Sequence, residues 1–360
     1  MSKTIELARR LERLHINNMY KSDFYWTWDK TDEELEAIFT VADALRDLRE
    51  RNQSTRIFDS GLGISIFRDN STRTRFSFAS ACNLLGLEVQ DLDEKKSQIA
   101  HGETVRETAN MVSFMADVIG IRDDMFIGEG HKYQKTFMDA LDEGYRDGIL
   151  EQRPTLVNLQ CDVDHPTQIL ADMMTIEEHC AKPLREVKVV FPGDIRNNMC
   201  YAWMYGCAKM GMHFVGYGPA SLEVDKTVLA QVQDVARRTG ATIEISHDER
   251  CLAGADVIYC DIWASMGEED LIPERAKLLS PYRVTEEMLE KTGNKNVLFM
   301  HCLPSFHDLN TKLAKEWEEK GVDIREVTDE VFRGPHSVVF DEAENRMHSI
   351  KAVLVATLGA

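Results

Sequence analysis

The chain has 360 residues, which is enough for two domains of ordinary size. Hydrophobic residues make up 43% of it and charged residues 29%, a composition that indicates a folded globular protein and excludes collagenous or disordered chains. The 42 basic and 61 acidic side chains give a formal net charge of −19 with neutral histidine, which disfavours a nucleic-acid partner. A small anionic ligand remains compatible with this charge if arginine side chains gather locally.

The cysteines and the N-terminus indicate the cellular compartment. Eight cysteines, without a CxxC pair and mostly within apolar stretches, predict reduced thiols. The first 15 residues form an amphipathic charged segment without the apolar core of a signal peptide, and no stretch reaches about 18 apolar residues. We therefore expect a cytoplasmic protein with no membrane partner.

In the first half of the chain, strands and helices alternate. Thr31 and Glu34 form a capping-box pattern at the start of a predicted helix, and Ser71 is the expected N-cap of another helix that ends at Gly86. Pro166 fits the first turn of a third helix. Strands are predicted near 64–67, 87–92, 117–122 and 155–160, and helices near 32–50, 71–85, 103–115, 134–143 and 166–180.

The second half repeats this alternation and ends in a helix over the last 18 residues. Strands are predicted near 187–191, 213–217, 242–246, 256–262 and 297–300, and helices near 197–210 and 225–239. Near-continuous apolar strands between helices predict an α/β protein with two doubly wound parallel-sheet domains joined by interdomain helices. We expect one domain over residues 1–165, completed by the C-terminal helix 342–360, and a second over residues 183–335.

Ligands of such sheets bind beyond the carboxyl ends of the strands, and the first of these junctions is rich in Ser, Thr and Arg. It reads FRDNSTRTRFSF over residues 67–78. Free amides at a helix N-terminus, three hydroxyl groups and two guanidinium groups at one point form a site for a phosphate dianion. The alternative is an ordinary capped surface helix.

Further polar residues follow other predicted strands. Arg122 could reach the same anion, although a single arginine at a strand end also fits a surface ion pair. His165 precedes a helix-starting proline, where a neutral imidazole with a lowered pKa could donate to a carbonyl oxygen, and Gln168 lies one turn on. A purely structural capping role for His165 remains open.

In the second predicted domain, the strand ends offer a carboxylate, amides and a thiol. Asp194, Asn197 and Asn198 surround a glycine turn, and Asp261 could hold an ammonium group. Cys302 suggests a thiol nucleophile, but a packed or hydrogen-bonding thiol is the alternative, because a nucleophile needs a base and an orienting partner. The chain has no HExxH, Walker A or strand-linked GxGxxG pattern.

Eight motifs occur in the order found in the aspartate/ornithine carbamoyltransferases, and the chain resembles that family over nearly its whole length. They are STRTR (71–75), SQIAHGE (97–103), Arg122, HPTQ (165–168), GDxRNNM (193–199), DxWxSMGE (261–268), HCLP (301–304) and ENRMH (344–348). The second half is most similar to ornithine carbamoyltransferases and the first half to YgeW-type carbamoyltransferases. Asp69 and Asn70 depart from the Lys and Asp usual before STRTR.

The resemblance implies that carbamoyl phosphate is the donor substrate. The phosphoryl group is expected to bind the STRTR turn and Arg122. The carbamoyl end is expected to contact His165, Gln168 and Arg346. Gln98 is expected to lie on a loop that enters a neighbouring subunit's site. The full set of implied carbamoyl-phosphate residues is Ser71, Thr72, Arg73, Thr74, Gln98, Arg122, His165, Gln168, Cys302, Leu303 and Arg346. Those implied to act in catalysis are Arg122, His165, Cys302 and Arg346.

The acceptor implied by the second half is L-ornithine, whose δ-amine would be carbamoylated to give L-citrulline and phosphate. Its implied binding residues are Asn198, Asp261, Ser265 and Met266. The resemblance also implies a homotrimer or a multiple of trimers, and a reaction that requires no metal or organic cofactor. Two alternatives stay open: a YgeW-type catabolic enzyme with another amine or ureido acceptor, and a non-catalytic anion-binding subunit.

Overall fold

The computed structural model describes residues 3–16, 19–126, 128–264 and 269–359. The chain divides into two compact units, Met1–Ala171 with Glu344–Ala360 (unit 1) and Asp172–Ala343 (unit 2). The chain passes between the units within α6 (Pro166–His179) and α13 (Val339–Leu358), so each of these helices contributes residues to both units.

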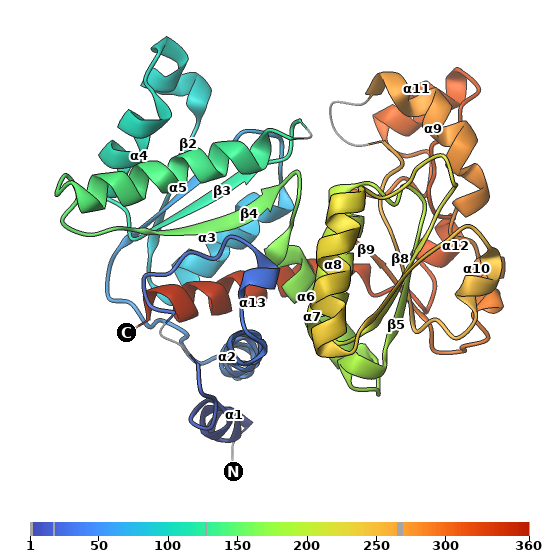
Figure 1. Cartoon of the computed structure of the whole chain (residues 1–360), viewed down its shortest axis with the longest axis horizontal. Coiled ribbons are helices and arrows are strands. Elements are labelled where there is room, and N and C mark those ends of the chain that lie inside the picture. Colours follow the sequence, from blue (N-terminus) through green and yellow to red (C-terminus); the bar gives the residue numbers. More distant parts are fainter. Residues whose placement is uncertain (1–2, 17–18, 127, 265–268, 360) are drawn as a thin grey trace. The chain divides into compact units, whose positions relative to one another are not determined.

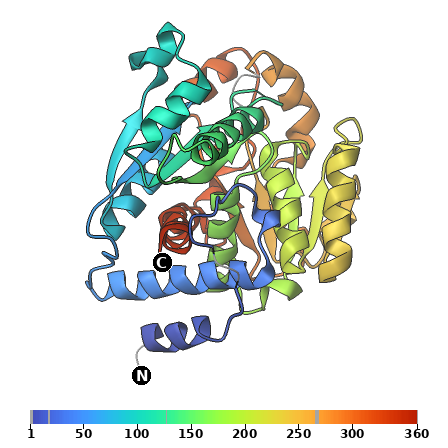
Figure 2. The same ribbon diagram turned by 60° about the vertical axis from the view of Figure 1, so that its left-hand side comes forward.

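Unit 1 is built on a four-stranded sheet with the order β2-β1-β3-β4, in which all paired strands are parallel (Figure 1). Its strands are β1 (Leu62–Phe67), β2 (Glu88–Leu92), β3 (Val118–Asp123) and β4 (Thr155–Cys161). Its other helices are α1 (Lys3–Leu11), α2 (Asp32–Glu50), α3 (Arg73–Leu85), α4 (Val105–Ser113) and α5 (Gly130–Arg146). Both views show α1 alongside α2, which begins with the predicted capping box (Figures 1 and 2).

Helices cover both faces of this sheet, as its apolar strands require. On one face, α4 and α5 pack on isoleucines of β1 and β3, including Ile66 and Ile121. On the other face lie α3 and α13. A Cβ atom at Gly63 would lie 2.9 Å from Cys82 Sγ, so the absence of a side chain there lets α3 approach the sheet closely.

The start of α3 differs from the sequence-based prediction. The helix begins at Arg73 and its N-cap is Thr72, so the prediction that Ser71 caps it is wrong. Thr72 has φ −97° and ψ −57°, a right-handed helical backbone, and its side chain makes no capping hydrogen bond. A capping side chain reaches back to the first-turn amides from an extended backbone, a geometry that Thr72 does not supply.

Unit 2 contains a five-stranded sheet with the order β7-β6-β5-β8-β9, again with parallel pairs. Its strands are β5 (Lys188–Pro192), β6 (His213–Tyr217), β7 (Thr242–Ser246), β8 (Val257–Cys260) and β9 (Leu298–His301). Its helices are α7 (Asn198–Met210), α8 (Lys226–Thr239), α9 (Ile272–Leu279), α10 (Glu286–Lys291), α11 (Lys312–Glu319) and α12 (Asp329–Phe332). The predicted α/β class with two parallel sheets is therefore confirmed.

Short and loop-embedded helices account for most of what the sequence pattern missed. The helices α9, α10, α11 and α12 have between four and eight residues, too few turns for a clear 3.6-residue period. The predicted helix 134–143 is longer in the structure and begins at Gly130. There the Asp162 carboxylate, distant in sequence, accepts hydrogen bonds from the amides of Gly128 and His131, both at 2.7 Å.

The eight cysteines form no disulfide bond with one another, as expected of reduced thiols, and five of them are buried. Within the described residues, no helix is both long enough and apolar enough to cross a bilayer.

Candidate active site

Arg122 lies at the carboxyl end of β3 and is almost fully buried. Its Nε donates to both carboxylate oxygens of Asp69, at 2.9 and 3.1 Å. Its Nη1 donates to Thr74 Oγ1 at 3.5 Å and also to Gln160 Oε1 on β4. Three strand or helix ends are thereby joined through one guanidinium group.

A second buried guanidinium group comes from the C-terminal helix. Arg346 of α13 donates through Nη2 to Thr74 Oγ1 at 2.7 Å and through Nη1 to Gln168 Oε1. Ser349, one turn on, donates to the Thr167 carbonyl at 2.8 Å and so ties α13 to the start of α6. The terminal helix therefore completes a site whose other parts come from the first 171 residues.

We call Asp69, Thr74, Arg122, Gln168 and Arg346 the guanidinium cluster. Thr74 Oγ1 is its centre, because it accepts from both arginines. A hydroxyl oxygen has two acceptor lone pairs and one proton, so the Thr74 hydroxyl can donate in a third direction.

His165 follows β4 and directly precedes α6, and it is buried. Burial lowers the pKa of His165 well below its ordinary value, and the positive charges of Arg346, Arg122 and Arg73 lower it further. Its Nδ1 is buried without a hydrogen-bond partner among the residues that the structure describes. The imidazole is therefore neutral at physiological pH and has one N–H group to donate.

The remaining residues predicted for carbamoyl phosphate differ in how closely the structure brings them to this cluster. Arg73 is the first residue of α3, is partly buried, and contributes to the positive potential at His165. Ser71 is partly buried and Thr72 is exposed, and both precede α3. Gln98 is exposed in the 3₁₀ helix η3 (Gln98–His101), and within the described chain its side chain makes no hydrogen bond to the cluster.

In unit 2 a carboxylate and a thiol meet at the ends of two neighbouring strands. Cys302, after β9, donates from Sγ to Oδ1 of Asp261, after β8, at 3.3 Å. The second oxygen of Asp261 accepts from Asn197 Nδ2 at 3.2 Å. The structure thus brings Asp261 and Cys302 together as candidate acceptor-side residues.

The neighbouring asparagines have different positions. Asn197 caps α7 by accepting from the Cys200 amide at 2.7 Å, and the same side chain orients Asp261. Asn198, the predicted ornithine ligand, is the first residue of α7. The other two predicted ornithine ligands, Ser265 and Met266, lie outside the described residues.

His301 shapes the turn that carries Cys302. Its Nδ1 accepts from the Leu303 amide at 2.8 Å, which places the ring proton on Nε2, 3.2 Å from Glu326 Oε1. Leu303 has a φ of +59°, in the left-handed region. This hydrogen bond holds a backbone conformation that leucine seldom adopts.

A buried pair of carboxyl groups, those of Glu342 and Asp172, lies next to the end of β9. Glu342 accepts from the His301 amide at 2.9 Å and from the Tyr259 hydroxyl at 3.3 Å. Burial raises the pKa of Glu342 well above its ordinary value, and Asp172, which shares a hydrogen bond with it, raises it further. No motif in the sequence marks Glu342 or Asp172, because their meeting depends on the packing of α6 and α13 against the sheet of unit 2.

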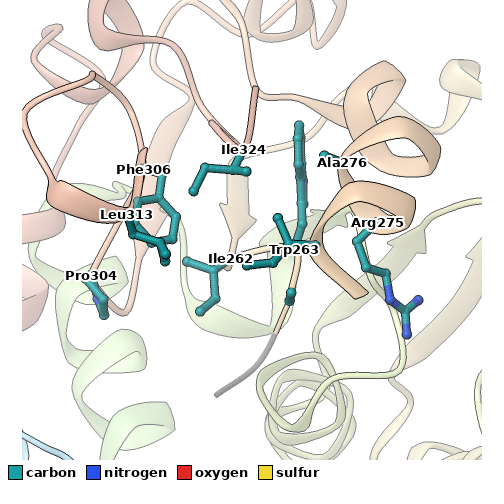
Figure 3. A pocket seen from close by; sticks show the side chains of 10 residues that line it. Ile262, Trp263, Arg275, Ala276, Pro304, Phe306, Leu313 and Ile324 are labelled. Carbon is teal, nitrogen blue, oxygen red and sulfur yellow. The ribbon is translucent and has the colours of Figure 1, made fainter. Parts of the chain in front are cut away.

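An apolar pocket of about 150 Å³ is lined in part by residues that follow β8 and β9 in the sequence, including Ile262 and Phe306. Figure 3 shows Ile262, Phe306, Leu313 and Ile324 turned toward one another, with the Arg275 guanidinium away from them. Arg275 pairs with Asp194 at 3.2 Å. Among the described residues, the lining of this pocket contains no carboxylate, whereas Asp261 lies beside Cys302 at the ends of β8 and β9.

Two groups of side chains among the described residues have spacings that could hold a metal ion, and protein partners already engage both. In the group Asp261, His301 and Cys302, the imidazole accepts from the Leu303 amide, and the carboxylate accepts from the Cys302 thiol and from Asn197. In the group His307, Asp308 and Asp329, the guanidinium of Arg333 supplies a cation to both carboxylates.

Comparisons with known proteins define the family. The carbamoyl-phosphate-binding domain of aspartate/ornithine carbamoyltransferase matches residues 22–178, and the Asp/Orn-binding domain of the same family matches residues 185–357. A catabolic ornithine carbamoyltransferase of Clostridium perfringens strain 13 is 48% identical over 330 residues, covering 89% of this chain and 93% of the relative. The carbamoyltransferase YgeW of Escherichia coli K12 is 40% identical, covering 99% of this chain and 94% of the relative.

Solved structures agree with these matches. The ornithine carbamoyltransferase of Pyrococcus furiosus superposes with a TM-score of 0.82 at 32% identity, covering 96% of this chain and 99% of that one. Fold, site and similarity together define an enzyme of the transferase class. The chain belongs to the aspartate/ornithine carbamoyltransferase family.

Proposed function

We propose that this enzyme transfers the carbamoyl group of carbamoyl phosphate to the δ-amine of L-ornithine, giving L-citrulline and phosphate. The observation that carries the proposal is the guanidinium cluster beside a neutral His165, in a protein whose net charge is −19. Buried arginines held by fixed acceptors form an anion site that does not need to reorganise when the ligand arrives.

The donor substrate is assigned to unit 1. The phosphoryl group lies against the N-terminus of α3, with Ser71, Thr72, Arg73, Thr74 and Arg122 as its ligands. Thr72 does not cap this helix with its side chain, which suits the N-terminus to an external anion. Gln168 and Arg346, already joined to each other, address the carbamoyl end together with His165.

The mechanism follows from where charge develops. The neutral amine attacks the carbamoyl carbon, the carbonyl oxygen becomes negative in a tetrahedral intermediate, and the C–O bond to phosphate then breaks. His165, Thr74 and Arg122 stabilise the oxygen, and Arg73 with the α3 amides stabilises the departing phosphate. The phosphate accepts the amine proton, and holding both substrates in reactive geometry lowers the barrier by up to roughly 7 to 11 kcal/mol.

The acceptor is assigned to unit 2. Asp261 orients the δ-ammonium group before it loses its proton, and Cys302 with the Leu303 carbonyl flanks the reacting amine. Asn198, Ser265 and Met266 are the proposed ligands of the α-amino and carboxylate end. The 48% identity to an enzyme named as an ornithine carbamoyltransferase supports this choice of acceptor.

An acceptor panel tests the proposal. Purified enzyme is given carbamoyl phosphate with L-ornithine, L-lysine, L-aspartate, putrescine or a set of ureido compounds, and ureido product and phosphate are measured. We expect L-ornithine to exceed every other acceptor in kcat/KM by at least 100-fold. Ornithine turnover no higher than the background without enzyme would contradict the assignment.

A second acceptor class is favoured by one observation. The match to YgeW covers 99% of this chain, whereas the match to the Clostridium perfringens ornithine carbamoyltransferase covers 89%. In the first half of the chain, the residues FRDN before STRTR resemble the YgeW-type pattern. Turnover of a different amine or of a ureido compound in the same panel would support that alternative. Carbamoyl phosphate binding without turnover of any acceptor would indicate a non-catalytic anion-binding subunit.

We also propose a homotrimer, alone or in multiples, in which Gln98 enters the site of a neighbouring copy. Three large apolar residues at the end of α4 are exposed: Met111, in its last turn, and Phe114 and Met115, in the turn that follows it, are 47%, 61% and 55% exposed. Exposed large apolar side chains so close together mark a protein contact.

Light scattering coupled to gel filtration tests the assembly. We expect a mass near three times 41.1 kDa, or a multiple of it, for the wild type, and smaller species for Phe114→Asp. Phe340→Asp, which changes an exposed phenylalanine of unit 2, is the matched control and should leave the mass unchanged. A wild-type monomer with full activity would contradict the shared site.

A further inference from the structure

One acidic side chain lies inside the otherwise cationic cluster of unit 1. Asp69 lies two residues beyond the end of β1, its side chain is 0% exposed, and it accepts both hydrogen bonds from Arg122 Nε. The cluster and its neighbour Arg73 thus bring three guanidinium groups and one carboxylate to the site assigned to a dianion. The proposed mechanism gives this carboxylate no part.

The contacts of Arg122 show what the carboxylate does to its geometry. Asp69 holds the guanidinium group at Nε, while Thr74 and Gln160 accept from Nη1. Among the described residues Nη2 has no hydrogen-bond partner, so this amino group is left to a ligand. A planar guanidinium group held on two sides points its third side in one fixed direction.

The same contacts show what the carboxylate does to the charge. Both partners of the Arg122–Asp69 pair are buried, at 9% and 0% side-chain exposure, so water screens the pair little. Asp69 therefore cancels much of the attraction that Arg122 exerts on a phosphate group. It also compensates a buried cation that would otherwise be unpaired whenever the site is empty.

We propose that Asp69 is a positioning residue and the counter-charge of the phosphate site: it aims Arg122 at the donor substrate and limits how tightly phosphate is held. The inference rests on the proposed function, because it takes the guanidinium cluster to be the phosphate site. An enzyme that must release phosphate after each turnover benefits from ground-state binding that is not maximal, since only interactions that strengthen in the transition state raise kcat.

Two substitutions separate the two roles. Asp69→Asn keeps an oxygen acceptor for Nε but removes the negative charge, so the dissociation constant of inorganic phosphate should fall about five- to tenfold while kcat stays within about threefold of the wild type. Asp69→Ala removes the acceptor as well, so kcat should fall at least tenfold although phosphate still binds at least as tightly as to the wild type. Rescue of kcat by Asn but not by Ala is the signature of positioning.

The matched control is Asp123→Asn. Asp123 lies beside Arg122, is buried, and pairs with a different arginine, Arg68, at 2.6 Å. We expect phosphate affinity within about twofold of the wild type for this variant. Thermal unfolding of all variants reports on folding independently.

The experiment is titration calorimetry with inorganic phosphate at low ionic strength, combined with steady-state kinetics. A phosphate dissociation constant unchanged in Asp69→Asn, or a wild-type kcat in Asp69→Ala, would overturn the inference. Failure of the proposed function looks different, because the wild type itself would then show neither phosphate binding nor carbamoyl transfer.

Discussion

The cluster proposed to bind the donor in unit 1 and the residues proposed to bind the acceptor in unit 2 are built in opposite ways. In unit 1, charged side chains from separate elements are buried and joined directly to one another through Thr74. In unit 2, a single partly exposed carboxylate, Asp261, meets the thiol of Cys302. The buried carboxyl groups of Glu342 and Glu326 contact His301, which precedes Cys302.

The difference follows from the charge of the protein. An excess of 19 negative charges opposes a dianion, so its site requires several arginines preorganised at one point. A cationic amine is attracted by the same field, and one oriented carboxylate suffices for it. We therefore expect substitutions in unit 1 to abolish the chemistry, and substitutions in unit 2 to act more selectively on the acceptor.

The largest expected effect is that of Arg73→Ala. The substitution removes a cation from the N-terminus of α3, where the leaving phosphate is proposed to lie. We expect kcat/KM for carbamoyl phosphate to fall at least 1,000-fold, with thermal unfolding within a few degrees of the wild type. Steady-state phosphate release and calorimetric melting measure the two quantities.

The control for that variant is Arg75→Ala, two residues along the same helix. Arg75 pairs with Asp91 and its guanidinium carbon lies 4.2 Å from the Phe67 ring centroid, so it is already used by structural partners. Less than a fivefold change in kcat/KM is expected. Wild-type turnover by Arg73→Ala would remove Arg73 from the donor site.

Asp261→Asn should have the next largest effect. In the wild type, Asp261 Oδ1 accepts from the Ile262 backbone amide at 2.8 Å. The asparagine side chain keeps an oxygen for this hydrogen bond but lacks the negative charge proposed to orient the amine. We expect kcat/KM for L-ornithine to fall about 100-fold, while the phosphate dissociation constant changes by less than twofold. An equal loss of ornithine use and phosphate binding would show that the two units do not divide the substrates as proposed.

How far the sequence predicted the fold depended on element length and on local signals. The helix α2 was predicted residue for residue from Thr31, Glu34 and the apolar period, because its cap and its pattern are both local. The start of α5 was missed because its amides bond to Asp162, a residue over 30 positions away. Local propensity carries no information about such a partner.

For the site, the sequence placed candidates at strand ends, but it did not show how they contact one another. Arg122, considered alone, fitted an ordinary ion pair as well as an anion site. The structure shows the ion pair, with Asp69 as its partner, and the anion site remains a prediction. The support from Glu342 was invisible, because a carboxylate on a helix pattern looks like any solvent-facing residue until packing buries it.

Glu342 offers a smaller and more selective way to test the acceptor side. Glu342→Ala removes the acceptor of the His301 amide and should displace the turn that carries Cys302. We expect kcat with ornithine to fall about tenfold and phosphate affinity to stay unchanged. Glu342→Gln, which keeps an acceptor and needs no proton, should retain kcat within about threefold. Equal activity losses in the two variants would show that the carboxylic acid itself, rather than its hydrogen bond to His301, is required.

The smallest expected effect concerns stability rather than catalysis. Asp164 is fully buried next to His165 and accepts from the Thr27 amide at 3.1 Å. Burial raises the pKa of Asp164 to about 7, whereas an unfolded chain has an aspartate pKa near 4. The folded state therefore binds this proton more tightly, so its stability is fully present below about pH 4 and decreases as pH rises to about 7.

Asp164→Asn keeps an acceptor for the Thr27 amide and removes the ionisation. We expect it to raise the free energy of unfolding by about 4 kcal/mol at pH 8 and to have no stabilising effect near pH 4, as measured by urea unfolding at both pH values. Asp162→Asn, two residues earlier, is the control. The Asp162 carboxylate accepts from the Gly128 amide just before α5 and from the His131 amide in its first turn, so the substitution should not stabilise the protein at pH 8. A stability gain of Asp164→Asn that is independent of pH would mean that the buried carboxyl is ionised in the folded protein, and that charged groups in unit 1 tolerate burial without a direct cationic partner.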